Sequence, residues 1–222
     1  MTTEPTGTAP ARTRNPRGEG GRLREEILAA VQALLDEGPA EAVTLRAVAR
    51  RTGIAAPSIY RHFPDLDHLL HAAVEDAFTE LRADLEVGRD GATSGDGAAT
   101  ARLFGTCEAY LAYARDHPQR YRLMLGGVWN ATAALGSGDA ERDERLRNLG
   151  LNAFEVLAHL VQDCVDEGAS SSRAPTADAV ALWVGLHGLA ELRRTAPLFP
   201  WPASLATDLV TNLAHVPTAT GS

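Results

Sequence analysis

The sequence predicts an all-α protein, and three observations support that fold class. Apolar residues recur at spacings of three and four along most of the chain, and no alternating apolar and polar run indicates a strand. Stretches rich in glycine, serine and proline interrupt this pattern repeatedly. With 222 residues, 45% of them hydrophobic, the chain is long enough to bury a core in one or two small domains.

The first predicted helix follows a weakly basic arm. Residues 1–21 are rich in glycine and proline and carry three arginines with almost no apolar residues, which predicts a disordered segment. From Arg22 onward, apolar residues at helical spacing predict a helix. Gly38 and Pro39 are expected to end it, because neither residue type continues a helix well.

Two shorter helices are predicted next, joined by a tight turn. Thr44 is expected to cap the first of them, because its hydroxyl can accept a free backbone N–H. Gly53 is expected to reverse the chain, since a left-handed turn costs glycine little. Pro57 suits the first turn of the next helix, where its missing N–H is harmless, and that helix is predicted to run to about Phe63.

The rest of the chain is predicted to be a bundle of longer helices. The apolar spacing predicts helices at about 66–86, 100–117, 118–130, 143–168, 176–196 and 203–214. The stretch 88–99 is expected to be a loop, and shorter breaks are expected at 136–139, 168–175 and 197–202. The predicted organisation is an arm (1–21), an N-terminal domain (22–66), a C-terminal domain (67–216) and a tail (217–222).

The charge distribution favours a protein with one basic end over one that coats nucleic acid. The net charge is −8, yet residues 1–63 hold nine arginines against seven acidic residues. All 21 basic residues are arginine. No apolar stretch approaches the roughly 18 residues of a membrane helix, and the N-terminus lacks the apolar core of a secretory signal. A cytoplasmic protein without a membrane partner is therefore expected.

Residues 44–63 have the pattern of a helix-turn-helix, in which the second helix enters the major groove of DNA. Ile54, Ile59 and Phe63 can face inward, which leaves a polar surface for DNA. On that surface Arg61 can donate two hydrogen bonds to a guanine edge. The other candidates reach a base or the phosphate backbone, and they are Arg46, Pro57, Ser58, Tyr60 and His62. Two roles are open for the three arginines of the arm: they enter a minor groove of DNA, or they only keep the arm soluble.

These segments resemble the N-terminal domain of TetR/AcrR-type transcriptional regulators. The resemblance covers residues 22–81 and rests on RLREEILAAVQALLDEG followed by TLRAVARRTGIAAPSIYRHFPDLDHLL. It implies a dimeric repressor that a small-molecule effector releases from a palindromic operator. It also implies that Thr44, Arg46, Pro57, Ser58, Tyr60 and His62 touch DNA. Leu66 departs from the family, which commonly has a phosphate-binding lysine there.

The segment 182–199 resembles the WHG-type C-terminal domain of some of these regulators, through Trp183, His187, Gly188 and the PLFPWP tail. A stripe of mostly small residues runs along the same predicted helix at spacings of four, three and four. Such a stripe allows a second helix to approach closely, either in a partner subunit or in the same chain. The predicted dimer interface consists of Ala181, Gly185, Gly188 and Leu192.

A cavity for a small apolar molecule with one or two polar groups is predicted among the C-terminal helices. Trp183 and His187 lie one helical turn apart on a face other than that of the stripe. The remaining candidates lie on preceding helices and are Tyr110, Tyr113, Arg122, Met124 and Trp129. The alternative is that these side chains are ordinary core residues.

Other kinds of site find little support in the sequence. His68 and His71 form an HxxH pair next to Asp65, but two histidines make a weak metal site and a polar helix surface explains them better. No motif for nucleotide, metal or nucleophilic chemistry occurs, so neither a catalytic residue nor a cofactor is predicted. Cys107 and Cys164 lie on apolar helix faces, which favours burial over a redox role.

The sequence thus predicts a dimeric DNA-binding regulator with an effector pocket. Two copies would place their recognition helices in successive major grooves, about 34 Å apart. The long helix at 66–86 joins both predicted domains and is the natural lever between them. Two alternatives stay open at this point, namely an all-α enzyme that retains a helix-turn-helix, and a partner-binding dimer without specific DNA.

Overall fold

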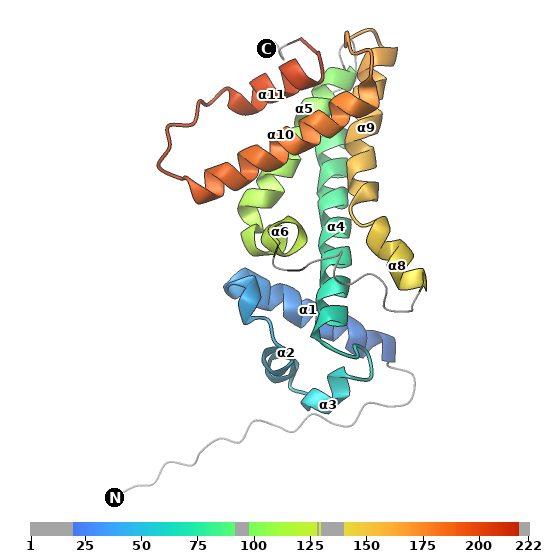
Figure 1. The fold of residues 1–222 in the computed structure, drawn as a ribbon, viewed down its shortest axis with the longest axis vertical. Coiled ribbons are helices and arrows are strands. Elements are labelled where there is room, and N and C mark those ends of the chain that lie inside the picture. The colour runs from blue at the N-terminus through green and yellow to red at the C-terminus, as the bar shows by residue number, and fades with distance from the viewer. Residues whose placement is uncertain (1–19, 92–97, 128, 130–139, 218–222) are drawn as a thin grey trace, which may run out of the picture. The chain divides into compact units, whose positions relative to one another are not determined.

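The computed structural model describes residues 20–91, 98–127, 129 and 140–217. Within these residues all regular structure is helical (Figure 1), which confirms the predicted fold class. The chain divides into two compact units, Met1–Ala73 and Val74–Ser222. The helix α4 (Leu66–Asp90) is continuous across that division. The predicted arm lies almost entirely outside the described residues, as do the whole of the predicted break at 136–139 and most of the tail.

The N-terminal unit is built on α1 (Gly20–Glu37), which packs against α2 (Leu45–Thr52). A short 3-10 turn, η1 (Ala40–Ala42), links them, and α2 in turn packs on α3 (Ala56–Ile59). Apolar side chains from these elements are excluded from solvent as the helical spacing predicts. The buried set includes Ile27, Val31, Leu35, Val48, Ile59 and Phe63.

Both ends of α2 are fixed by the residues that the sequence singles out. The Thr44 hydroxyl accepts a hydrogen bond from the backbone N–H of Ala47 at 3.1 Å. Gly53 ends the helix with φ +66°, in the left-handed region that side chains disfavour. The α2–α3 turn is therefore specified locally by one cap and one glycine.

The predicted recognition helix is shorter than expected. Regular helix α3 covers Ala56–Ile59, and the predicted continuation to Phe63 is wrong. The chain keeps turning, because the amides of His62 and Phe63 both donate to the carbonyl of Ile59, at 2.8 and 2.9 Å. Residues 60–62 thus follow α3 as a hydrogen-bonded turn.

The helix α4 extends further than predicted and makes a close contact with α5 (Ala98–Asp116). The sequence predicts a loop from Gly88, but this glycine lies inside α4. A Cβ atom placed on Gly88 would come within 2.6 Å of the carbonyl oxygen of Gly105 and 2.7 Å of the Ala109 Cβ. The two helices touch backbone to backbone there, so Gly88 is a packing residue and not a helix breaker.

The predicted helix at 143–168 is two helices. They are α8 (Ala140–Arg147) and α9 (Leu151–Asp166), and Gly150 separates them with φ +79°. A Cβ on Gly150 would lie 2.8 Å from the Phe78 ring of α4, so this glycine also permits a close approach. The preceding α6 is Pro118–Leu125 and ends at Gly126, short of the predicted residue 130.

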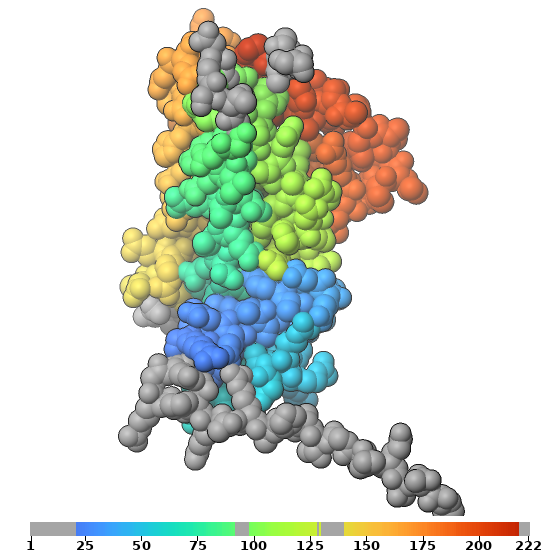
Figure 2. All heavy atoms as spheres, turned by 180° about the vertical axis from the view of Figure 1, so that it is seen from behind, coloured from blue at the N-terminus to red at the C-terminus, as the bar shows by residue number. Residues whose placement is uncertain are grey.

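The C-terminal unit is completed by α10 (Pro175–Thr195) and α11 (Leu205–Leu213). Helix α10 packs on α9, α5 and α11, and α11 also packs on α5. The connection between α10 and α11 projects from the rest of this unit (Figures 1 and 2). It is held by a hydrogen bond from the Trp201 indole N–H to the carbonyl of Ala196 at 3.0 Å, while Leu198 is 96% exposed.

Candidate nucleic-acid interface and C-terminal hollows

The α2–α3 turn presents a polar surface to solvent. Ile59 is buried and anchors α3, whereas Pro57 and Arg61 are exposed and Tyr60 is 54% exposed. Ser58 and His62 are half-buried beside them. Thr44, at the start of α2, is also exposed while its hydroxyl caps the helix. The structure thus brings the predicted DNA-contacting residues of α3 and its following turn to the solvent side of one short segment.

The arginines of the N-terminal unit divide into paired and unpaired ones. Arg51 is hydrogen bonded to Glu37, and this hydrogen bond lowers the pKa of the Glu37 carboxyl. Arg24 lies over the Phe63 ring, 5.1 Å from its centroid. In contrast, Arg46, Arg50 and Arg61 are exposed and form no ion pair within the described part of the chain. These three guanidinium groups remain available to a polyanion.

Arg50 was missed by the sequence-based prediction. It lies four residues after Arg46, and positions four apart share one face of a helix. Both side chains are exposed on α2. The spacing alone was a usable signal, but neighbouring Arg51 has the same charge and only the structure shows that Arg51 is committed to Glu37.

An aromatic hydrogen-bonded chain occupies the middle of the C-terminal unit. The hydroxyls of Tyr110 and Tyr121 are 2.9 Å apart, and the Tyr121 hydroxyl is 2.7 Å from Nδ1 of His187. The Trp183 ring packs edge-on against Tyr110, with centroids 5.1 Å apart. The structure therefore brings together three of the seven predicted pocket residues, namely Tyr110, Trp183 and His187. Tyr121, which the sequence analysis did not include, links Tyr110 to His187. Tyr110 and Tyr121 are buried, so this chain is packed and not hollow.

Two other predicted pocket residues belong to a separate contact. The Tyr113 hydroxyl donates to the carbonyl of Ala77 at 3.1 Å and lies 3.8 Å from the Met124 sulfur. The Arg122 guanidinium donates to Gln119 at 3.1 Å on the same helix. Trp129 is buried. None of these four lines the hollows described below, whereas Trp183 does.

Burial of the tyrosines makes folding sensitive to alkaline pH. Removal from water raises the pKa of Tyr110 to about 12, and it also raises the pKa values of Tyr113 and Tyr121. A raised pKa in the folded state favours the protonated phenol, so this stabilisation is complete below the unfolded value of about 10 and is lost as pH rises through the folded value.

We therefore expect the free energy of unfolding to fall between about pH 10 and pH 12. Urea titrations at stepped pH, followed by circular dichroism and phenolate absorbance, measure this. Tyr110→Phe should reduce the fall, because it removes one titrating group and leaves Tyr121 bonded to His187. Ionisation of these phenols near pH 10 without loss of helix would contradict the expectation.

The predicted small-residue stripe does not face one direction only. A Cβ on Gly185 would meet the Leu213 Cδ1 at 3.0 Å, so this glycine packs against α11 of its own chain. Ala181 and Leu192 are exposed, and a Cβ on Gly188 would meet no atom within 4 Å. Three of the four stripe residues thus remain accessible in the single chain.

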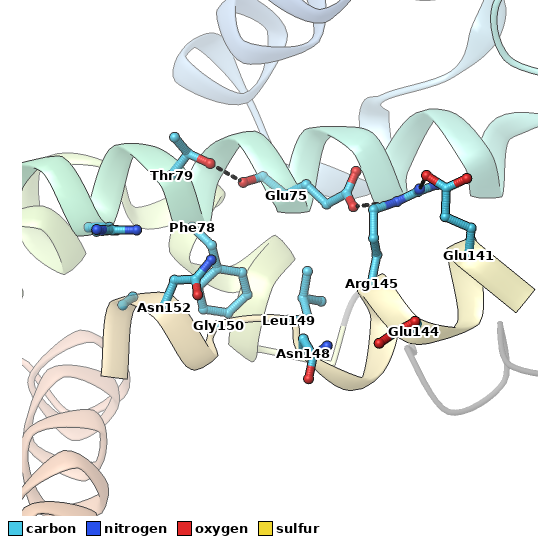
Figure 3. A pocket seen from close by; sticks show the side chains of 12 residues that line it. Glu75, Phe78, Thr79, Glu141, Glu144, Arg145, Asn148, Leu149, Gly150 and Asn152 are labelled. Carbon is cyan, nitrogen blue, oxygen red and sulfur yellow. Dashed lines mark hydrogen bonds and ion pairs between the residues drawn. The ribbon is translucent and has the colours of Figure 1, made fainter. Parts of the chain in front are cut away.

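The C-terminal unit contains two adjoining hollows. The first, of about 420 Å³, lies between α4, α8 and α9 and is lined by three glutamates and two arginines among its 12 residues. Figure 3 shows Arg145 of α8 between two carboxylates: its Nε is 3.2 Å from Glu75 and its Nη1 is 2.8 Å from Glu141. We call it the acidic hollow. The second hollow, of about 310 Å³, shares Phe78, Leu149 and Gly150 with it and is mainly apolar.

His68 of the histidine pair has a carboxylate partner, and the two cysteines are buried. Nδ1 of His68 is 2.8 Å from Asp65, and among the described residues no group of three His, Cys, Asp or Glu is arranged to hold a metal ion. Cys107 and Cys164 are buried free thiols, as predicted, and burial raises the pKa of Cys164 to about 11.

No helix in the described ranges is long and apolar enough to cross a membrane.

Comparison with known families decides what this arrangement is. A family model described as bacterial regulatory proteins of the tetR family matches residues 27–73. A second, described as a tetracyclin repressor-like C-terminal domain, matches residues 103–215, just over half of the 222-residue chain. The chain belongs to the TetR family. The predicted family and function are confirmed: this TetR-family protein is a DNA-binding transcriptional regulator with a helix-turn-helix.

Individual relatives agree with this assignment. The TetR-family regulator is 28% identical over 196 residues to the HTH-type transcriptional regulator Rv0681 of Mycobacterium tuberculosis, covering 86% of this chain and 79% of the relative. It is 42% identical over 60 residues to the repressor KstR of the same organism, covering 27% of each chain. Its fold matches that of PfmR from Thermus thermophilus with a TM-score of 0.60 at 19% identity, covering 84% and 96% of the two chains.

Proposed function

We propose that this regulator is a homodimeric repressor that binds a palindromic operator and leaves it when a small molecule binds. The observation that carries the proposal is the exposed α2–α3 surface, where three arginines have no ion pair with any described residue, in a chain whose net charge is −8. A cationic surface confined to one region of an acidic protein supports DNA binding through that region alone. The relative KstR is itself named a repressor. The proposal assigns no catalytic step to the chain and places it in the cytoplasm with its DNA.

The proposed DNA contacts are those of the predicted set, with Arg50 added. Arg61 reads a base, while Ser58 contacts a base or a phosphate. The remaining members position the protein on the backbone, and they are Thr44, Arg46, Arg50, Pro57, Tyr60 and His62. Footprinting of the full-length protein on DNA flanking its gene tests this. A protected palindrome supports the proposal; binding without sequence preference contradicts it.

We propose that the dimer forms through the exposed face of α10. Val184 and Leu192 on this helix are 62% and 49% exposed, and the open Gly188 lies between them in sequence. Exposed apolar side chains on one helix are typical of a protein interface. The α10–α11 connection, which projects from the rest of this unit (Figure 1), carries two further exposed apolar side chains, Leu198 and Phe199. A second copy of the chain is the occupant that operator symmetry requires.

Replacing Val184 by Glu should convert the dimer to a monomer. A buried, unpaired carboxylate in each copy costs several kcal/mol, whereas the exposed site leaves the fold of one chain intact. Sedimentation equilibrium measures the mass. The matched control is Val87→Glu on α4, because Val87 is another apolar residue that is 72% exposed. An unchanged dimer in Val184→Glu, or equal dissociation in both variants, would count against this interface.

Release by an effector requires a coupling free energy between the ligand and DNA sites. Because coupling is reciprocal, operator DNA must weaken effector binding by the same factor. If the effector acts by changing the separation of two recognition helices, it weakens binding to the whole palindrome more than to a half-site. Equal responses of both DNAs to the effector would reject this mechanism.

A further inference from the structure

The mainly apolar hollow in the C-terminal unit has the composition of a small-molecule site. We call it the Trp183 groove. Its lining comes from α4, α6, α9, α10 and the end of α8, and is Phe78, Leu125, Arg147, Leu149, Gly150, Leu151, Phe154, Val180 and Trp183. At about 310 Å³ it is at the lower end of the range for ligand pockets, about 300–1,000 Å³. A compact ligand with mostly apolar surface fits this lining.

One charged group interrupts that apolar surface. Arg147, the last residue of α8, is the single charged side chain among the nine lining residues. It is exposed and has no ion pair within the ranges that the structure describes. An unpaired guanidinium beside an apolar wall recognises a carboxylate through two parallel hydrogen bonds.

The neighbouring acidic hollow shows why Arg147 is the group that selects the ligand. Arg145 in that hollow is already paired with Glu75 and Glu141, and Arg82 is paired with Glu86 at 3.0 Å. Carboxylates of the same chain already balance the charge of these two guanidinium groups. Among the described residues Arg147 has no carboxylate partner, so an anion gains most by lying in the Trp183 groove.

We propose that the Trp183 groove binds a small amphipathic carboxylic acid, with its apolar part against Trp183 and Phe78 and its carboxylate on Arg147. The inference rests on the proposed function, for which it specifies the chemical class of the effector. A neutral molecule of the same length leaves the guanidinium without a partner, and a cationic one is repelled by it. The groove therefore selects by charge sign as well as by apolarity.

Calorimetric titration of the full-length regulator with decanoate, decanol and decylamine tests the charge selection. We expect decanoate to bind about tenfold more tightly than decanol, and decylamine to bind most weakly. In Arg147→Gln the preference for decanoate over decanol should disappear while decanol binding is unchanged. The matched control is Arg173→Gln, which removes another exposed, unpaired arginine between α9 and α10 and should keep the preference.

Fluorescence quenching locates the ligand independently of the charge. Bromine quenches a tryptophan that it touches, so a terminally brominated fatty acid should quench the emission of the wild-type chain and of Trp201→Phe. It should not quench Trp183→Phe, in which Trp129 and Trp201 remain. Persistent quenching in Trp183→Phe overturns the location, and equal affinity for decanoate and decanol in the wild type overturns the chemistry.

Operator binding separates this inference from the proposed function. If the ligand-free regulator binds its operator but shows no preference for decanoate, the groove inference fails and the proposed DNA binding stands. If decanoate binds through Arg147 but no operator is bound, the proposed function fails and the ligand site stands. If both hold, decanoate should lower operator affinity in the wild type and not in Arg147→Gln.

Discussion

Replacing Arg61 by Ala should lower operator affinity by about ten- to a hundredfold, because a bidentate pair between arginine and guanine contributes about 1–3 kcal/mol of discrimination. Arg61 is exposed directly after α3 and has no ion pair among the described residues, so its guanidinium is available to a base edge. Binding to random duplex should weaken much less, since such binding depends on phosphate contacts alone. Electrophoretic mobility shifts on both DNAs at one salt concentration measure the difference.

The matched control for Arg61 is Arg51→Ala. Arg51 lies in the same unit and carries the same charge, but it is engaged by Glu37. Its removal should change both affinities by less than Arg61→Ala does. If Arg61→Ala weakens operator and random duplex equally, Arg61 contacts phosphates instead of a base.

Replacing Gly105 by Ala should destabilise the C-terminal unit by about 1–3 kcal/mol, the usual cost of overpacking. A Cβ on Gly105 would overlap the carbonyl group of Gly88, and backbone on both sides leaves no flexible side chain to move aside. Alanine is the better helix former by about 1 kcal/mol, so the observed loss is what remains after that gain. Helices α4 and α5 would have to separate, which also strains the hydrogen bond from Thr106 to the Leu85 carbonyl.

Urea unfolding at a fixed protein concentration measures this loss, because the apparent stability of the proposed dimer would depend on concentration. The control is Gly21→Ala in α1, where a Cβ would meet no atom within 4 Å. That variant should be neutral or slightly more stable, as alanine favours the helix. Gly105→Ala as stable as the wild type would show that the two helices can move apart freely.

Most helices could be predicted from the sequence, because their ends depend on neighbouring residues. Thr44 and Gly53 bound α2 through a cap and a left-handed turn, both local effects. Two of the errors arose at glycines that pack closely against residues distant in the sequence. Gly88 resembles a helix breaker in the sequence, but in the structure its backbone packs against Gly105. Gly150 divides a predicted helix through its left-handed φ of +79°, and the Phe78 ring leaves no room for a Cβ atom there.

The candidate sites could be predicted to the extent that they follow from the pattern of one segment. The polar surface of α3 and its following turn depends on residues within one short stretch, so Pro57, Tyr60 and Arg61 were identifiable in advance. The hollows combine side chains from three helices in one case and five in the other. Helical spacing could not show that Tyr110 is packed against Tyr121, or that Arg147 completes an apolar groove with Trp183.

The two cysteines make the native protein convenient for spectroscopic labelling. Maleimide and methanethiosulfonate probes react with exposed thiolates, and both Cys107 and Cys164 are buried thiols with raised pKa values. A new cysteine at an exposed site such as position 50 would therefore react selectively, with the wild-type background left in place. If the chain forms the proposed dimer, spin labels at this site, one on each subunit, would report by electron resonance the distance between the two labelled sites with and without decanoate.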